Sequence, residues 1–472
     1  MSVLKLPHEP TAGELLVLTG TGAGRRLSLR ERTPETPLPL PLMSDLLEGA
    51  TARPFGVEER CRVAGTAGGL ALECDAGSAA AGVVVDLGGT LPRGASLAAA
   101  VRSRGAAGFS TQLVSAGADA ESPLALKEGA TRLPVPGAGA GPAQLAIVAP
   151  AEGGRLQLEG LELVAAVPKG EGAARSAWAW EPRRWRDEPE RLIAEAVARG
   201  VRRLSVTLDI PEGRVRDPAA LGRFVGLAGD AGLTVEAVEG DPQMVEAGGL
   251  GRALERARAI AAYQAEAPAK ARLAGVQYDI EPYSLAGWGR PPTDFTAWAG
   301  AVNRLAAAAA TRIDLVLPCW IADTDSGRAF LAEVRPSLRS LTAMTYRTDP
   351  AALTRAAEPL LHWGAAAGVP VRIALEAGPV ADEWEELFAP APAGTLAVKA
   401  GAGASAELYA AATAVAGAAM YASLGRTRVR GDRISFLGDE ARMMATAGRL
   451  EPAFAAWPSF AGYAFHGLGW SG

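Results

Sequence analysis

The sequence predicts an N-terminal all-β sandwich, jelly-roll-like in character, followed by a (β/α)8 barrel. Three observations support this prediction: a length of 472 residues, a first third built of short apolar runs between turns, and a strand-then-helix rhythm afterwards. A chain of this length exceeds one ordinary core, so two domains are the first expectation. We expect the sandwich over residues 1–168 and the barrel over 176–472, with a linker "PKGEGAARS" between them.

The sandwich is predicted from apolar runs that recur at short intervals. In the run at 156–159, Leu-Gln-Leu-Glu, the alternation gives a strand one dry and one wet face. Strands spaced in this way are typical of an antiparallel sandwich. Phe55 and Phe109 are its only aromatic residues, so we expect either a carbohydrate-binding-module-like domain or a structural one. The runs are "ELLVLTG", "GGLALECDAG", "AGVVVDLGG", "FSTQLVSAG", "AQLAIVAP" and "LQLEGLELVAAV".

The barrel is predicted from eight strands that alternate with helical patterns, an arrangement typical of a (β/α)8 fold. Three of the helical patterns open on an aspartate that can cap the free N–H groups of the first turn, namely Asp187, Asp217 and Asp294. An open doubly wound sheet is the alternative, but no glycine-rich phosphate loop follows any of the strands. The expected strands are 176–181, 203–209, 233–239, 273–281, 312–320, 340–347, 369–377 and 460–467.

One segment interrupts the rhythm of the barrel. Residues 380–438 form a long excursion before the last helix and strand, and an Ala-rich stretch at 404–422 predicts a helix within it. Connections between barrel strands and helices usually have 2–6 residues. We therefore expect this insertion to form a lid or a rim over the cleft.

Composition excludes several classes of partner. The chain is 49% hydrophobic and 21% charged with a formal net charge of -5, which is ordinary for a globular protein. No block of like charges suggests nucleic-acid binding, and no run of about 18 apolar residues predicts a membrane span.

The cellular location stays open at this stage. The first residues contain no apolar run long enough for a signal peptide, so the protein is cytoplasmic as written or exported with its leader trimmed. Cys61 and Cys74 could pair in an exported domain, but two small buried thiols are the favoured interpretation.

Candidate functional residues lie where barrel chemistry is found, at the C-terminal ends of the strands. They are carboxylates and aromatic rings, and the chain has only three histidines and no G-x-S-x-G motif. We therefore expect no metal, no cofactor and no serine triad. The catalytic candidates are Asp279, Glu281, Tyr346 and Glu376, and the substrate-binding candidates are Trp180, Tyr278, Tyr283, Trp320, Arg347, His466 and Trp470.

Carboxylates beside aromatic rings are typical of sugar cleavage. A glycosidic bond needs an acid that protonates the leaving oxygen and a negative group that stabilises the oxocarbenium-like transition state. Asp279 and Glu281 are two residues apart on the fourth strand, so both side chains point to the same side. Two close carboxylates oppose double ionisation, which keeps one of them protonated. We expect Glu281 to be the general acid and Asp279 to tune it.

These motifs resemble family 18 of the glycoside hydrolases, the chitinase-like barrels, of which this chain would be a divergent member. The fourth strand of that family carries D-G-x-D-x-D-x-E, and "AGVQYDIE" keeps Gly275, Asp279 and Glu281 while Ala274 and Gln277 replace the first two aspartates.

The resemblance extends to two later strands. The sixth strand of the family carries M-x-Y, matched by Met344 and Tyr346, with Arg347 where an aspartate usually follows. Trp470 is placed like the tryptophan that floors the sugar site after the eighth strand. The resemblance covers residues 176–472 only.

Two mechanisms remain open. The resemblance implies that the substrate's own N-acetyl group is the nucleophile, helped by Asp279 and Tyr346. Glu376, at the end of the seventh strand, could instead be a retaining nucleophile or an inverting base. A separation from Glu281 of about 5–5.5 Å favours the nucleophile, and about 6.5–9.5 Å favours the base.

Three classes of function follow from these residues. The first is a glycoside hydrolase that cleaves a poly- or oligosaccharide. The second is a catalytically silent carbohydrate-binding protein on the same scaffold, and the third is an interaction role for the sandwich. The presence of both Asp279 and Glu281 favours the enzyme.

Overall fold

The fold was analysed in a computed structural model of the chain. The structure describes residues 2–5, 14–21, 24–31, 38–56, 60–117, 122–136, 141–167, 172–285, 288, 294–400, 405–410 and 416–469.

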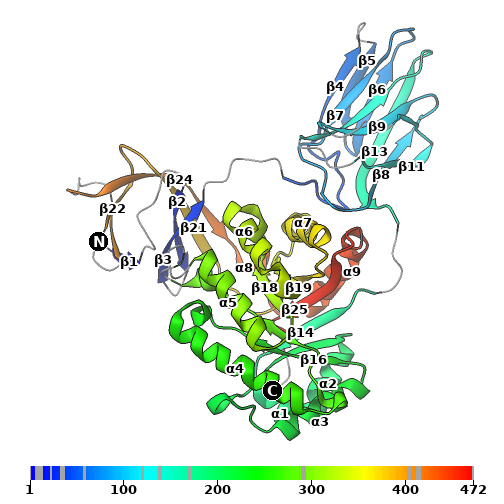
Figure 1. Ribbon diagram of the computed structural model, residues 1–472. Helices are drawn as coiled ribbons and strands as arrows, with labels where there is room; N and C mark the ends of the chain where they lie inside the picture. Colours follow the sequence, from blue (N-terminus) through cyan, green and yellow to red (C-terminus); the bar gives the residue numbers. More distant parts are fainter. Residues whose placement is uncertain are drawn as a thin grey trace.

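The central domain is a closed barrel of eight parallel strands, as the sequence predicts (Figure 1). Each observed strand overlaps one of the eight expected segments. The strands follow one another around the barrel in chain order, and β25 closes it by pairing with β14. They are β14 (Arg175–Ala179), β15 (Arg203–Thr207), β16 (Thr234–Glu239), β17 (Val276–Tyr278), β18 (Ile313–Pro318), β19 (Leu338–Met344), β20 (Val371–Glu376) and β25 (Phe460–His466).

Helices cover the outside of this barrel. Asp217 and Asp294 cap the helices that follow them, each accepting a backbone N–H in the first turn, as expected from the sequence. Asp187 does not cap a helix, contrary to expectation, because it is the last residue of one helix and Glu188 occupies the N-cap of the next. No helix in the described ranges is long and apolar enough to cross a membrane. The helices are α1 (Pro182–Asp187), α2 (Pro189–Ala198), α3 (Pro218–Asp230), α4 (Ala247–Glu266), α5 (Phe295–Ala308), α6 (Asp325–Val334), α7 (Pro350–Ala367), α8 (Gly431–Ile434) and α9 (Glu440–Phe454).

Two five-stranded antiparallel sheets form the predicted sandwich. Their inward residues, such as Leu145 and Leu163, are fully buried, while their neighbours along the strands are partly exposed. One sheet has the order β10 (Leu124–Ala125), β9 (Ser110–Ser115), β12 (Ala143–Val148), β7 (Ala81–Asp86), β4 (Thr51–Gly56). The other has the order β11 (Gly129–Pro134), β8 (Leu97–Arg104), β13 (Gly154–Ala165), β6 (Gly69–Cys74), β5 (Cys61–Thr66).

A disulfide joins two neighbouring strands of the sandwich. Cys61 and Cys74 are bonded to each other, whereas the sequence analysis favoured two free thiols. The hairpin register of β5 and β6 explains the difference, because it places the two cysteines directly opposite each other.

A third sheet was not foreseen. It has seven antiparallel strands, and its two edge strands, β1 and β3, approach each other, so the sheet curls around its own apolar side chains. Leu16, Phe388, Val398 and Tyr421 are buried inside this curl. The order is β1 (Ser2–Lys5), β23 (Ser405–Ala410), β22 (Leu396–Ala400), β24 (Ala419–Val429), β21 (Glu383–Pro390), β2 (Glu14–Thr21), β3 (Gly24–Glu31).

The curled sheet corrects two expectations. Residues 2–31 were expected in the sandwich, but β2 pairs with β21 of the insertion, opposing Leu16 to Phe388. The Ala-rich stretch 404–422 was expected to be helical, but its described part contains β23 and the start of β24. Pairing with distant strands overrides the helix propensity of alanine here, because a local preference of a few tenths of a kcal/mol per residue is small beside burial.

The sandwich contacts the barrel on the side of α7 and α9 (Figure 1). The guanidinium of Arg93 donates two hydrogen bonds to Glu358 of α7, and its carbonyl accepts the indole N–H of Trp457 at 2.8 Å. Ser96 also donates its backbone N–H to the carbonyl of Ala456 at 2.8 Å. These bonds tie one loop of the sandwich to α7 and to the segment that leads into β25.

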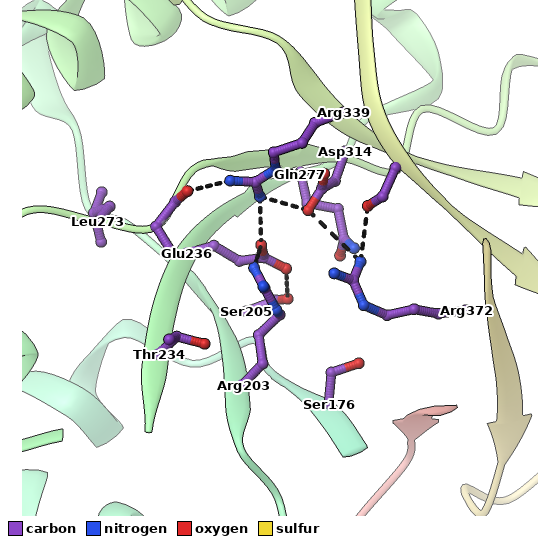
Figure 2. Close-up of polar contacts among 12 residues, drawn as sticks. Ser176, Arg203, Ser205, Thr234, Glu236, Leu273, Gln277, Asp314, Arg339 and Arg372 are labelled. Carbon is purple, nitrogen blue, oxygen red and sulfur yellow. Dashed lines mark hydrogen bonds and ion pairs between the residues drawn. The ribbon is translucent and has the colours of Figure 1, made fainter. Parts of the chain in front are cut away.

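The barrel interior is charged at its N-terminal end. Arg339 donates to Asp314 at 2.8 and 2.6 Å and to Glu236 at 3.0 Å, and Arg203 donates to Glu236 at 2.8 Å (Figure 2). Arg372 adds an ion pair with Asp314 at 3.6 Å. Glu236 and Asp314 are fully buried, so their charges depend on these guanidinium groups rather than on water.

Candidate active site at the barrel mouth

Inward positions on the strands form layers, because alternate residues of each strand point into the barrel. The ion pairs around Glu236 and Asp314 form the charged layer. Two residues further along each strand, towards its C-terminal end, lies an apolar layer. Beyond that layer is the opening at the C-terminal strand ends, here called the mouth. The apolar layer consists of Trp178, Val238, Val316, Met344, Ala374 and Ala464.

The fourth strand delivers both predicted carboxylates to the mouth. Asp279 follows Gln277 on the inward side, and Glu281 follows Asp279. Glu281 has left-handed backbone angles, φ 49° and ψ 47°, and begins the short 3-10 helix η4 (Pro282–Ser284). A non-glycine residue in this conformation is strained, and such strain is found at functional sites. The carbonyl of Glu281 accepts hydrogen bonds from both the backbone N–H and the hydroxyl of Ser284, which holds the turn.

Tyr283 orients the Glu281 carboxylate. Its hydroxyl donates to Glu281 Oε1 at 2.6 Å, and its ring contacts Trp320 edge-on at 5.4 Å between centroids. Burial, followed by the charge of Glu281, raises the pKa of Tyr283, so the hydroxyl stays protonated and remains a donor. The structure thus places Tyr283 against a carboxylate that was expected to be catalytic.

We expect Tyr283→Phe to lower activity on a glycoside substrate by about 10- to 100-fold, because losing one hydrogen bond to a charged group costs about 1.5 to 3 kcal/mol when it orients the reacting acid. The measurement is kcat/KM for the variant and the wild type. Tyr409→Phe is a matched control, since Tyr409 donates in the same way to Glu407 in the curled sheet. Equal activity of Tyr283→Phe and wild type would show that the bond does not orient Glu281.

Asp279 is the carboxyl whose ionisation the site disturbs most clearly. Burial raises the pKa of Asp279 to about 7, the charge of Glu281 adds to this, and His466 opposes it. Its Oδ1 is buried and has no hydrogen-bond partner among the described residues. An acceptor without a partner in such a place is costly unless a ligand supplies a donor. Asp279 is therefore ready to hold a proton near neutral pH and to receive a donor from a ligand.

The raised pKa of Asp279 gives a prediction on stability. Its folded value of about 7 lies above the ordinary value of 3.8, so the folded state holds the proton more tightly between these two pH values. The wild type should lose stability as the pH rises from about 4 to about 7, because a buried carboxyl must then ionise. Asp279→Asn has no carboxyl to ionise at this position. Its melting temperature relative to that of the wild type should therefore rise as the pH increases over that range. Parallel melting curves of the two proteins against pH would contradict the assignment.

Tyr346 comes to the same place from the sixth strand. Its ring stacks on that of His466 at 6.3 Å between centroids. Burial raises the pKa of Tyr346 strongly, and the charges of Asp279, Glu376 and Glu281 add to the rise. The hydroxyl therefore stays protonated beside the carboxylates, and it has no hydrogen-bond partner in the described part of the chain.

Both carboxylate oxygens of Glu376 form hydrogen bonds with other groups of the protein. Its Oε2 lies 2.6 Å from Nδ1 of His466, and its Oε1 accepts the backbone N–H of Gly378 at 2.5 Å. The side chain of Glu376 is nine-tenths buried, with a residue exposure of 6%. The carboxylate therefore faces His466, its neighbour in the register of β20 and β25.

Two tryptophans border the mouth with part of their rings open. Trp180 is 38% exposed and Trp320 is 37% exposed. Each ring therefore offers an apolar surface on which the face of a sugar could pack. The indole N–H of Trp180 donates to His466 Nε2 at 3.0 Å. Arg347 is also exposed and donates to the carbonyl of Tyr346. Trp470 lies outside the described residues.

Tyr278 does not belong to the site, contrary to its expected role in substrate binding. It is fully buried, and its hydroxyl is near Glu239 and Arg256 on the outer side of the strand. The physical reason is the period of the strand, because Tyr278 lies between the inward residues Gln277 and Asp279 and so points the other way.

Other carboxylates at the strand ends have structural partners. Asp209 pairs with Arg216, Glu239 with Arg256, and Asp241 accepts the backbone N–H of Gln243. These bonds agree with the capping and pairing roles that such residues most often have. In the described ranges, no three metal-ligating side chains are grouped where they could hold an ion.

Trp178 was not among the expected site residues. Its indole N–H donates to Oε1 of Gln277 at 2.6 Å, and its ring supports His466 edge-on at 5.6 Å between centroids. The position of Trp178, two residues before Trp180 on the first strand, was the signal that could have identified it.

Comparisons with known proteins were made on both sequence and structure. No family model matches the sequence, and no curated protein matches it. The fold is similar to SleL, the spore cortex-lytic enzyme of Bacillus megaterium QM B1551, with 9% identity, a TM-score of 0.33, and 65% of this chain and 73% of that one covered.

Two chitinases are similar at the same level. The GH18 chitinase ChiB of Flavobacterium johnsoniae has 9% identity and a TM-score of 0.33, with 64% of this chain and 90% of that one covered. A class V chitinase of Pseudomonas fluorescens Pf-5 has 13% identity and a TM-score of 0.34, with 64% and 96% covered. With TM-scores this low, the barrel assignment rests on the eight paired strands of this chain, and the activity rests on its own site.

Proposed function

We propose that the protein is a glycoside hydrolase that cleaves a poly- or oligosaccharide at the mouth of its barrel. The observation that carries this proposal is the meeting of Asp279, Glu281 and Tyr346 at one place, where the charges of both carboxylates act on the tyrosine and the charge of Glu281 acts on Asp279. Trp180 and Trp320 supply partly exposed rings beside them.

Glu281 is the proposed general acid and base. In cleavage, the bond between the anomeric carbon and the leaving oxygen breaks while Glu281 gives its proton to that oxygen. Tyr283 fixes the orientation of this carboxyl through its 2.6 Å hydrogen bond. Asp279 is ready to hold a proton beside Glu281, since burial and the charge of Glu281 raise the pKa of Asp279.

For the nucleophile, we propose an acetamido group of the substrate rather than Glu376. The oxygens of Glu376 are bound to His466 and to the N–H of Gly378, which leaves the carboxylate poorly placed to attack. Asp279 Oδ1, in contrast, lacks a donor among the described residues, and an acetamido N–H would supply one. The acetamido oxygen then attacks the anomeric carbon, and water opens the resulting ring with Glu281 as the base.

For the sandwich, we propose a structural role rather than sugar binding. The bonds from Arg93 to Glu358 and from Trp457 to Arg93 support a fixed position against the barrel. Phe109, one of its two aromatic rings, is buried.

The test is hydrolysis of two matched aryl glycosides, one with a 2-acetamido group and one with a 2-hydroxyl group. The proposal expects cleavage of the acetamido substrate with retained configuration and little cleavage of the other. Equal cleavage of both would exclude the acetamido mechanism. Saturable binding of chitooligosaccharides without any cleavage would instead assign the chain to the catalytically silent carbohydrate-binding class.

A further inference from the structure

Glu376, His466 and Trp180 form a continuous chain of hydrogen bonds from the barrel wall to the mouth. The backbone N–H of Gly378 donates to Glu376 Oε1, Glu376 Oε2 contacts His466 Nδ1, and Trp180 donates its indole N–H to His466 Nε2. The chain begins on β20, passes through β25 and ends just after β14, so it links three adjacent strands.

The surroundings of Glu376 leave it little freedom. Gly378 and Gly467 pack against it so closely that a Cβ added at Gly467 would lie 2.3 Å from Glu376 Oε1. Gly467 also has φ +67°, a conformation that favours glycine. The carboxylate is therefore held in place by the close packing of Gly378 and Gly467 and by the pairing of Glu376 with His466 in the register of β20 and β25.

These contacts select one neutral form of the imidazole ring. An indole N–H can only donate, so Nε2 of His466 must be the acceptor and carry no proton. Nδ1 then carries the proton and donates it to Glu376. A second proton on the ring would occupy Nε2 and break the bond to Trp180, while the bond to Glu376 would remain.

We propose that Glu376 is a positioning residue that keeps the proton of the neutral His466 ring on Nδ1, which leaves Nε2 free to accept the indole N–H of Trp180 and fix that ring at the mouth. Trp180 is 38% exposed, so its fixed ring forms one wall of the place where a sugar would lie. Contact of the Trp180 ring with a sugar rests on the proposed function. The hydrogen bonds among Glu376, His466 and Trp180 can be tested whether or not the protein is active.

The groups that face His466 determine how it titrates. Burial alone lowers the pKa of His466, but the hydrogen bond and charge of Glu376, with the charges of Asp279 and Glu281, raise it overall. The ring of Tyr346 stacks on it, and Trp178 and Trp180 contact it edge-on. Protonation of the ring therefore releases Trp180 while it keeps Glu376 bound.

The test measures the ring itself by NMR of the full chain labelled with ¹⁵N in histidine and tryptophan. The chain has only three histidines, so loss of one signal in His466→Asn assigns it. In the wild type we expect the neutral ring of His466 to be protonated on Nδ1, and the indole signal of Trp180 to shift with the same pKa as His466.

In Glu376→Gln we expect the pKa of His466 to fall by roughly 1 unit or more, because the facing negative charge is lost. The preference for Nδ1–H should also weaken, and the Trp180 signal should no longer match that of the wild type. Glu181→Gln is the matched control, since Glu181 lies beside Trp180 but pairs with Arg183. If the His466 ring of Glu376→Gln keeps the tautomer and the pKa that it has in the wild type, the proposal is overturned.

A second variant covers the case in which Glu376→Gln does not fold. Trp180→Phe removes the donor that stabilises the neutral ring, so the pKa of His466 should rise, and an unchanged value would overturn the link to Trp180. If the wild type cleaves no glycoside, the proposed function fails while these ring measurements still decide the inference. If it is active, Trp180→Phe should raise KM more than it lowers kcat.

Discussion

Glu281→Gln is expected to lower the rate on a glycoside with a poor leaving group by about 10² to 10⁴-fold, which is the usual contribution of a general acid. The amide keeps the size of the side chain and can still meet the hydroxyl of Tyr283, but it has no proton to give. A substrate with an activated aryl leaving group should lose much less, because its oxygen leaves without protonation. The measurement is kcat/KM on both substrates.

Glu181→Gln controls for the loss of a charge at the same rim, since Glu181 is exposed and pairs with Arg183. It should match the wild type on both substrates. A Glu281→Gln protein with full activity on both would remove Glu281 from the mechanism, and an equal loss on both would assign it a role in binding instead of proton transfer.

Asp314→Asn is expected to reduce the free energy of unfolding by about 3 to 5 kcal/mol, as happens when one partner of a buried ion pair is removed. Asp314 is fully buried and holds Arg339 and Arg372 at the bottom of the barrel (Figure 2). Burial is the main cause of the raised pKa of Glu236 and persists in this variant, so Glu236 replaces the lost charge poorly. Urea unfolding followed by tryptophan fluorescence measures the loss.

Asp325→Asn is the control for this change, because Asp325 forms an exposed pair with Arg328 that is worth at most about 1 kcal/mol. A double variant, Asp314→Asn with Arg372→Met, also removes the buried guanidinium that loses its carboxylate partner in the single variant. It should recover part of the loss if an unpaired buried charge is the cause. A loss no larger than that of the control would mean that water or a rearrangement replaces Asp314.

The barrel could be predicted from the sequence because its evidence is local. Each strand and helix shows its own period over a few residues, and Asp217 and Asp294 mark helix starts by chemistry that acts within one turn. The curled sheet could not be predicted in this way. Which strand pairs with Leu16 depends on Phe388, far along the chain, and an alanine-rich strand such as β23 has no helical or strand period strong enough to reveal the pairing.

The candidate site also has features that the sequence predicts and features that depend on contacts between distant residues. The position of Asp279, Glu281 and Tyr346 at one end of the barrel followed from strand parity and the fold. The state of each group did not, because it depends on contacts between strands. The contact of Glu376 with His466 joins two strands and leaves no mark in either strand's sequence. Tyr278 is next to Asp279 in sequence but points to the other side of the strand, where it is fully buried.

The pairing of β2 with β21 also has a consequence for the order of synthesis. During translation the segment 14–31 is made first, yet its partner strand lies beyond seven of the eight barrel strands. At about 5 to 20 residues per second, the ribosome needs roughly 20 to 70 s to make the intervening chain. For that time an apolar hairpin has an unpaired edge, which other chains could recruit. Nascent chains of this protein should therefore depend on a chaperone near the ribosome more than the barrel alone would.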